Sequence, residues 1–210
     1  MQSTSISDFS NRLAAICSAG GPTPDQYDTL VEDIEKLYFA VGKGEISQSE
    51  IRGALESLGR PFSTETIQGY GLRKPRGYAG DFEMIEKIYS FHKSDDQELA
   101  TWDNFFHSQH APKAVRNRKT YFHGLLDKLP ERAKVLKLGC GPGRGMFEWL
   151  SANPEREIHF DCIDIDENAI EYAGDLNRAH FNRIVFHKKN VLRFTPPRRQ
   201  VRPDMGCRAI

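Results

Sequence analysis

A short apolar run that leads into a cluster of glycines constrains this chain more than any other feature. Residues 135–138 are predicted to form a strand, and residues 146–150 are predicted to form a helix. Between them, Gly139, Gly141 and Gly143 occupy every second position. A strand, a glycine turn and a helix in this order begin a nucleotide-binding βαβ unit. The glycines permit positive φ angles and let a ligand lie against the backbone, and the helix start offers N–H groups to an electron-rich ligand.

The spacing of the glycines separates two kinds of nucleotide site. A dinucleotide site uses G-x-G-x-x-G, and its third glycine allows close packing of the helix against the strand. Arg144 stands at that third position here, and its long side chain disfavours NAD or FAD. An NAD-linked oxidoreductase is therefore the weaker alternative. The pattern is instead G-x-G-x-G, which either binds another nucleoside or only makes a tight turn.

The next expected strand ends in acidic residues. Residues 157–166 are predicted to form a buried strand that leads into a helix, and Asp164 lies 25 residues after Gly139. An acid at the carboxyl end of this strand is placed to accept hydrogen bonds from both ribose hydroxyls of a nucleoside. We expect this role for Asp164 in preference to a purely structural one, and we expect Asp166 to cap the following helix. A third strand is expected at residues 183–187.

The part of the chain before the glycine motif is expected to be mainly helical. Apolar residues recur at helical spacing in residues 1–60, and Ser47 and Glu50 form a predicted capping box. We expect this region to serve as a helical support or as an oligomer surface. Residues 69–80 are rich in glycine, aromatic and basic residues, and we expect a loop there that either presents cations and ring hydroxyls to a ligand or is a solvated connector. Asp81 is expected to cap the helix that follows.

Composition argues against several classes of protein. Of the 210 residues, 39% are apolar, which is enough for the core of one or two domains. The chain has 29 basic and 29 acidic residues, so no net charge favours nucleic acid or a membrane surface. No apolar run of about 18 residues predicts a membrane span, and the N-terminus lacks the pattern of a signal peptide.

The cysteines and histidines predict neither disulfides nor a metal site. The seven histidines lack metal-ligand spacing, and the cysteines contain no C-x-x-C pair. We therefore expect reduced thiols in a cytoplasmic protein and no bound metal. The four cysteines are Cys17, Cys140, Cys162 and Cys207.

Three segments together resemble one family of enzymes. Residues 74–84, residues 114–118 and the glycine motif resemble class I S-adenosylmethionine (SAM)-dependent methyltransferases. Within that class they are similar to the bacterial extracellular-factor 3-hydroxypalmitic acid methyl ester biosynthesis family. The resemblance covers about residues 60–200. It implies an α/β fold in which a helical N-terminal or cap region, residues 1–130, precedes the first half of a Rossmann-like SAM-binding domain, residues 131–200. That half-domain has three parallel strands in an incomplete sheet.

The resemblance also implies SAM as the cofactor and assigns residues to its site. No residue is assigned a catalytic role and no metal is implied. One departure is Lys137, because most class I methyltransferases have an acid there to hold the methionine amino group. Asn190 is either a contact to the adenine edge or a turn residue. The residues expected to bind SAM are Gly139, Cys140, Gly141, Gly143, Asp164 and Asn190. The residues expected to face the substrate in the cleft are Arg76, Tyr78 and Arg116.

The family label implies methyl transfer to a carboxylate of a fatty-acid-like substrate, such as a 3-hydroxy fatty acid. A carboxylate is ionised at neutral pH, so this reaction needs no general base. Arg76 or Arg116 is expected to orient the substrate carboxylate. If the acceptor is a hydroxyl, a base is required, and His107, His110 and His123 become the candidates. The alternative function is a non-catalytic module that binds SAM or another nucleotide, and the sequence does not indicate an oligomeric state.

The last ten residues do not fit the family pattern. One permitted set of codons for residues 201–210, read one base later, encodes Tyr-Asp-Leu-Ile-Trp-Ala-Ala-Gly-Leu, which resembles the strand expected in the family at this point. We therefore expect a frameshift after Gln200. A chain with this tail lacks the strand that normally pairs with the other side of the first strand, and we expect it to be an inactive or poorly folded fragment.

Overall fold

The computed structural model describes residues 6–193, which divide into two compact units. Within the described residues, unit 1 comprises residues 6–80 and 90–113, and unit 2 comprises residues 81–89 and 114–193. The expected helical region 1–130 therefore contributes to both units. The expected tail at residues 201–210 lies outside the described residues.

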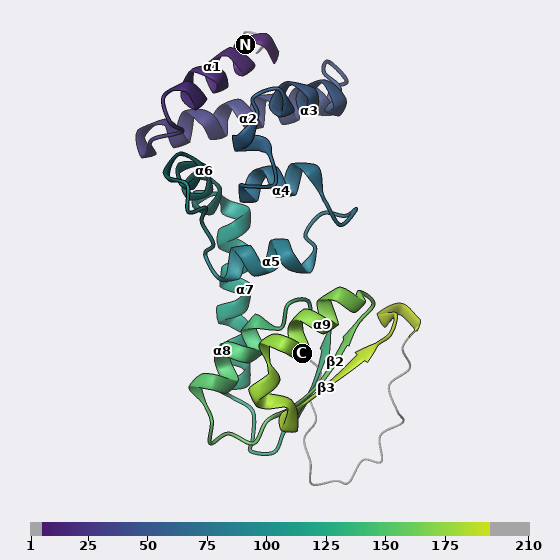
Figure 1. Cartoon of the computed structure of the whole chain (residues 1–210). Coiled ribbons are helices and arrows are strands. Elements are labelled where there is room, and N and C mark those ends of the chain that lie inside the picture. Colours follow the sequence, from purple (N-terminus) through teal and green to yellow (C-terminus); the bar gives the residue numbers. More distant parts are fainter. Residues whose placement is uncertain (1–5, 194–210) are drawn as a thin grey trace. The chain divides into compact units, whose positions relative to one another are not determined.

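Unit 1 consists of helices and connecting turns in the part of the chain that the structure describes (Figure 1). Its helical character agrees with the prediction for residues 1–60, and the capping box is confirmed, since the Ser47 hydroxyl accepts from the Glu50 N–H while the Glu50 carboxylate accepts from the Ser47 N–H. Its helices are α1 (Ile6–Ser18), α2 (Tyr27–Gly42), α3 (Gln48–Glu56), α4 (Ile67–Arg73) and α6 (Gln97–Ser108), with short 3₁₀ turns η1 (Pro24–Gln26) and η2 (Arg60–Phe62).

The core of unit 1 surrounds a buried tryptophan and a buried carboxylate. Trp102 of α6 is 2% exposed and packs edge to face against Phe62, with ring centroids 5.3 Å apart. The next residue of the same helix, Asp103, is fully buried. Its two oxygens accept hydrogen bonds from the backbone N–H groups of Ile67 and Ser94, each at 2.8 Å. A buried carboxylate therefore fixes both the start of α4 and the segment before α6.

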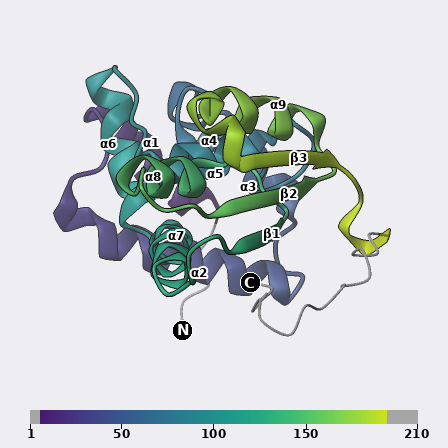
Figure 2. The same cartoon turned by 90° about the horizontal axis from the view of Figure 1, so that it is seen from below.

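Unit 2 is an α/β unit with three parallel strands side by side in the order β1-β2-β3 (Figure 2). The expected parallel strands are confirmed, and within residues 6–193 β1 pairs with β2 alone. Asp166 caps α9 as predicted, through its bond from the Asn168 N–H. The elements are α5 (Phe82–Tyr89), most of α7 (His110–Leu126), β1 (Lys134–Leu138), α8 (Arg144–Ala152), β2 (His159–Asp164), α9 (Glu167–Leu176), η3 (Arg178–Arg183), β3 (Ile184–Lys188) and η4 (Val191–Arg193).

The main core of unit 2 lies against one face of this sheet. Val135 of β1 is aligned with Phe160 of β2, so both side chains face the same side of the sheet, where α7 and α8 contribute buried residues such as Met146 to the same cluster. On the opposite face, Leu138 and Val185 are 48% and 54% exposed. Parallel strands normally have both faces covered, so the described part of unit 2 has one completed face and one partly bare face.

Replacing Asp103 with alanine is expected to destabilise unit 1. The substitution leaves the N–H groups of Ile67 and Ser94 without their acceptor, which costs about 2–4 kcal/mol. Urea unfolding followed by tryptophan fluorescence measures the loss. The matched control is Asp95→Ala, at an exposed position nearby, which should change the free energy of unfolding by less than about 0.5 kcal/mol. Equal effects of the two substitutions would contradict the proposed role of Asp103.

Candidate functional site

The glycine loop between β1 and α8 forms the candidate site. Gly139, Gly141 and Gly143 have φ angles of 62°, 54° and 73°, in the left-handed region that favours glycine. A Cβ atom added to Gly139 or Gly141 would meet no other atom within 4 Å. The backbone at these two positions therefore borders open space, which fits a ligand lying against it.

Gly143 has a different role from the other two glycines. A Cβ atom there would lie 2.8 Å from Nδ2 of Asn177 and 3.0 Å from Cβ of Ala173. Ala173 belongs to α9, and Asn177 ends that helix. Gly143 therefore allows the start of α8 to approach α9 closely. Packing against α9, without any ligand, explains why a glycine stands at this position.

Asp164 at the end of β2 holds the glycine loop in place. Its Oδ2 accepts a hydrogen bond from the Gly141 N–H at 2.9 Å, and its Oδ1 accepts one from the Asp166 N–H at 3.1 Å. The Gly139 N–H also bonds to the carbonyl oxygen of Ile163, at 2.8 Å. The structure thus brings together Asp164 and the glycines, as expected. Each carboxylate oxygen can accept more than one hydrogen bond, so Asp164 keeps the capacity to accept ribose hydroxyls.

Cys140 is a buried thiol beside this carboxylate. Cys140 is 4% exposed, and burial raises the pKa of its thiol to about 12. The negative charge of Asp164 raises this pKa further. Burial also raises the pKa of Cys162 on β2. Both groups therefore remain protonated at neutral pH and serve as small packing residues, not as nucleophiles. The backbone of Cys140, by contrast, is part of the loop.

Asn190 follows β3 and acts as a turn residue in this structure. Its Oδ1 accepts from the Leu192 N–H at 2.9 Å, and its carbonyl oxygen accepts from the Arg193 N–H at 3.0 Å. These two bonds organise η4. Turn formation explains the asparagine by itself, and an additional contact to adenine stays a prediction.

Lys137 lies on β1 two residues before the loop. It is on the same face as Val135 and is aligned with Cys162 of β2. Its Nζ atom is 4.5 Å from the centre of the Phe122 ring, a distance typical of a cation–π contact. Burial lowers the pKa of Lys137 and nearby Arg118 adds to this shift, since both disfavour the charged form.

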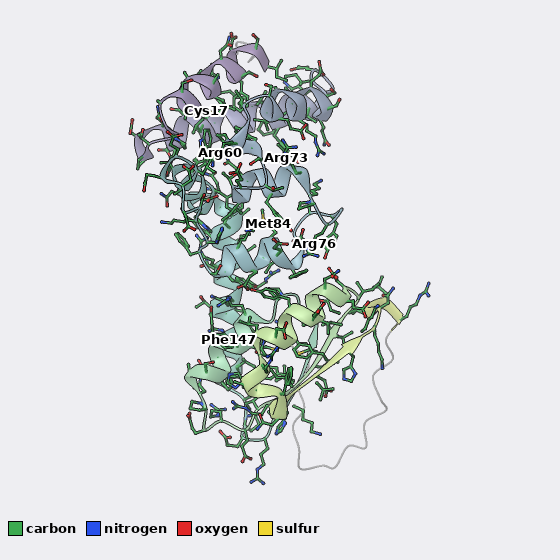
Figure 3. The ribbon with its side chains drawn as sticks, in the orientation of Figure 1. Cys17, Arg60, Arg73, Arg76, Met84 and Phe147 are labelled. Atoms are coloured by element: carbon green, nitrogen blue, oxygen red, sulfur yellow. The ribbon has the colours of Figure 1, made fainter. Side chains whose placement is uncertain are left out.

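The expected substrate residues are divided between the two units. Arg76 and Tyr78 lie in the exposed loop after α4 in unit 1, and Figure 3 labels Arg76 there. Arg116 lies on α7 in unit 2, where partial burial lowers the pKa of its guanidinium. The grouping of these three side chains in one cleft therefore stays a prediction.

Two of the three histidines considered as bases have structural hydrogen bonds. His107 of unit 1 is buried, bonds through Nε2 to the carbonyl oxygen of His92, and stacks on Phe91. His123 of α7 donates from Nε2 to the carbonyl oxygen of Gly145. In both rings Nε2 is engaged by a carbonyl oxygen, so only Nδ1 could accept a proton, and a role as base stays a prediction.

The sequence analysis missed an ion pair between α8 and α5. Arg144 was expected only to obstruct a pyrophosphate, but its guanidinium pairs with the carboxylate of Glu86. The Tyr172 hydroxyl of α9 interacts with both groups, and Glu86 is 8% exposed. Because Glu86 and Arg144 are 58 residues apart, neither helical periodicity nor a short motif could have revealed the pair.

No protein-family model, no curated protein and no solved structure matches this chain. Among residues 6–193, no three histidine, cysteine or acidic side chains are grouped so that they could hold a metal ion. Within the same residues, no helix is both long and apolar enough to cross a membrane.

Substitution of Gly143 is expected to be more harmful than substitution of Gly139. Both alanine variants force a side chain into a left-handed conformation, which costs about 1–2 kcal/mol. Gly143→Ala also pushes Cβ into α9, which adds about 1–3 kcal/mol. Comparison of the two urea unfolding midpoints checks this expectation, and equal losses would show that α9 does not constrain Gly143.

Loss of the Arg144 side chain is expected to cost about 2–4 kcal/mol, because Arg144→Met leaves the Glu86 carboxylate buried without its cation. The double variant Arg144→Met/Glu86→Gln should recover part of this loss in a double-mutant cycle of thermal or urea unfolding. Arg178→Met is the control. It breaks an ion pair with Asp175 in which both side chains are mostly exposed, so the change should stay within about 0.5 kcal/mol.

Proposed function

We propose that unit 2 binds S-adenosylmethionine and that the protein is a SAM-dependent methyltransferase acting on the carboxylate of a fatty-acid-like substrate, such as a 3-hydroxy fatty acid. One observation carries the cofactor proposal. The Asp164 carboxylate bonds to the glycine loop at a point where the backbone of Gly139 and Gly141 borders open space. A nucleoside could rest on that backbone and donate its ribose hydroxyls to Asp164.

The residues of unit 2 fit an adenosyl group better than a dinucleotide. Arg144 occupies the position where the third glycine of a dinucleotide site would stand, and its pairing with Glu86 fixes its side chain there. A pyrophosphate would therefore meet a long side chain held in place. An adenosyl group needs only the glycine backbone and the ribose acceptor, both of which the loop offers.

The proposed reaction requires alignment more than proton transfer. When bound, SAM supplies a methyl group activated by a positively charged sulfur. The acceptor carboxylate is already ionised at neutral pH, so the chain has to position it in line with the methyl group and exclude water. We assign the positioning of the carboxylate to a cation, with Arg76 and Arg116 as the residues to test.

A second function, binding without turnover, is favoured by the state of the sheet. Within residues 6–193, no strand lies on the far side of β1. A methyl acceptor must be enclosed and aligned beside the cofactor, and an open edge at β1 leaves this part of the site unbuilt. We therefore propose that the 210-residue chain binds SAM weakly or without methyl transfer.

The binding proposal predicts a specific loss in the Asp164→Ala variant. Wild-type chain should bind S-adenosylhomocysteine in isothermal titration calorimetry, and Asp164→Ala should weaken this binding by about tenfold or more, because two ribose hydroxyls lose a charged acceptor. The control is Asp161→Ala on the same strand, whose side chain is 51% exposed and pairs with His187. Absence of binding by the folded wild-type chain would refute the cofactor proposal.

Transfer of a labelled methyl group from SAM to 3-hydroxydecanoate distinguishes the two functions. Binding without incorporation supports the non-catalytic reading of this chain. Binding together with catalytic incorporation supports the methyltransferase and refutes the proposal that the 210-residue chain is inactive.

A further inference from the structure

We propose that Lys137 is a specificity-determining residue that binds a carboxylate of the ligand at the glycine loop. This inference rests on the proposed function of unit 2. The carboxylate has two possible sources, which are the amino-acid end of SAM and the acid group of the methyl acceptor.

The first argument is the absence of an acidic partner for Lys137. Within residues 6–193, Lys137 makes no ion pair and no hydrogen bond, and its Nζ atom instead lies over the Phe122 ring. Two other cations of unit 2 are paired with acids: Lys119 with Glu148 and Arg144 with Glu86. Lys137 is thus a half-buried ammonium group that forms no ion pair with an acid in the described chain.

The second argument is the position of this ammonium group. Lys137 is two residues before Gly139, at the end of β1 that leads into the open glycine loop. The N-terminus of α8 begins at Arg144, just after this loop, and a helix N-terminus also favours negative charge. The Asp164 carboxylate favours the charged form of Lys137 but does not pair with it, and its two oxygens are bonded to the Gly141 and Asp166 N–H groups.

The third argument is the energetic state of the free ammonium group. Burial disfavours the charged form of Lys137 and lowers its pKa. A carboxylate arriving beside it would reverse this penalty, because an opposite charge at short range favours the ammonium form. A ligand amine in the same place would be repelled. The site therefore selects a carboxylate on the side of β1 and rejects a lone cation.

Calorimetric titration of the full 210-residue chain with four ligands tests this proposal. S-adenosylhomocysteine carries a carboxylate, and 5′-methylthioadenosine carries the same nucleoside and a thioether without the amino-acid end. 3-Hydroxydecanoate carries an acid, and its methyl ester does not. The variants are Lys137→Met, which removes the charge, and Lys137→Arg, which retains it. Lys134→Met is the control at the exposed first residue of the same strand.

If the cofactor supplies the carboxylate, Lys137→Met weakens S-adenosylhomocysteine binding by about tenfold or more and leaves 5′-methylthioadenosine unchanged. If the acceptor supplies it, the same variant weakens 3-hydroxydecanoate binding by a similar factor and leaves its ester unchanged. In either case, Lys137→Arg retains most of the binding, and Lys134→Met behaves as wild type. Circular dichroism confirms that the compared variants are folded.

Three results overturn the proposal. The first is unchanged binding of both carboxylate ligands by Lys137→Met, and the second is tighter binding of S-adenosylhomocysteine by this variant. The third is a loss of binding in Lys137→Arg as large as the loss in Lys137→Met. Failure of the proposed function looks different, because then neither adenosyl ligand binds wild type, and Lys137 is judged by 3-hydroxydecanoate alone. If wild type binds none of the four ligands, both proposals fail.

Discussion

The hydrogen bond from the Gly141 N–H to the Asp164 carboxylate is the interaction on which the rest of unit 2 depends. It joins the loop after β1 to the end of β2, and the Gly139 N–H reinforces the junction through the carbonyl oxygen of Ile163. A left-handed glycine loop has few side chains with which to hold its shape. An acceptor on the neighbouring strand supplies that support, so a residue expected to bind ribose also builds the surface on which a nucleoside would rest.

Charge pairing around this loop explains why Lys137 stands out. Two acids of unit 2 are engaged by other cations: Glu148 by Lys119, and Glu86 by Arg144. The cation–π contact with Phe122 stabilises the ammonium group without neutralising it. A charge that is partly buried and not neutralised lowers stability unless a ligand or another interaction compensates it. The proposed carboxylate site is one such compensation, and it is consistent with open space over the adjacent glycines.

Local patterns in the sequence predicted the local parts of this fold. The strands were predicted from their apolar runs, and the caps at Ser47 and Asp166 from polar residues that precede helices. The pairing of Arg144 with Glu86 and the inclusion of α5 in unit 2 could not be predicted in this way, because both depend on contacts between distant segments. The close approach of α9 to Gly143 could not be predicted from local sequence patterns for the same reason. A glycine motif specifies positive φ angles, but it does not say which glycine is required by a ligand and which by a neighbouring helix.

The open edge of the sheet at β1 affects ligand binding and methyl transfer differently. The contacts proposed for the nucleoside, at Gly139, Gly141 and Asp164, all lie within residues of unit 2 that are already held together. Within residues 6–193, by contrast, β1 has one neighbouring strand, and Leu138 on its outer face is 48% exposed. Methyl transfer needs a second wall that fixes the acceptor and keeps out water. Binding of a nucleoside at Gly139, Gly141 and Asp164 therefore requires less of the fold than methyl transfer, which requires a site that encloses both the cofactor and the methyl acceptor.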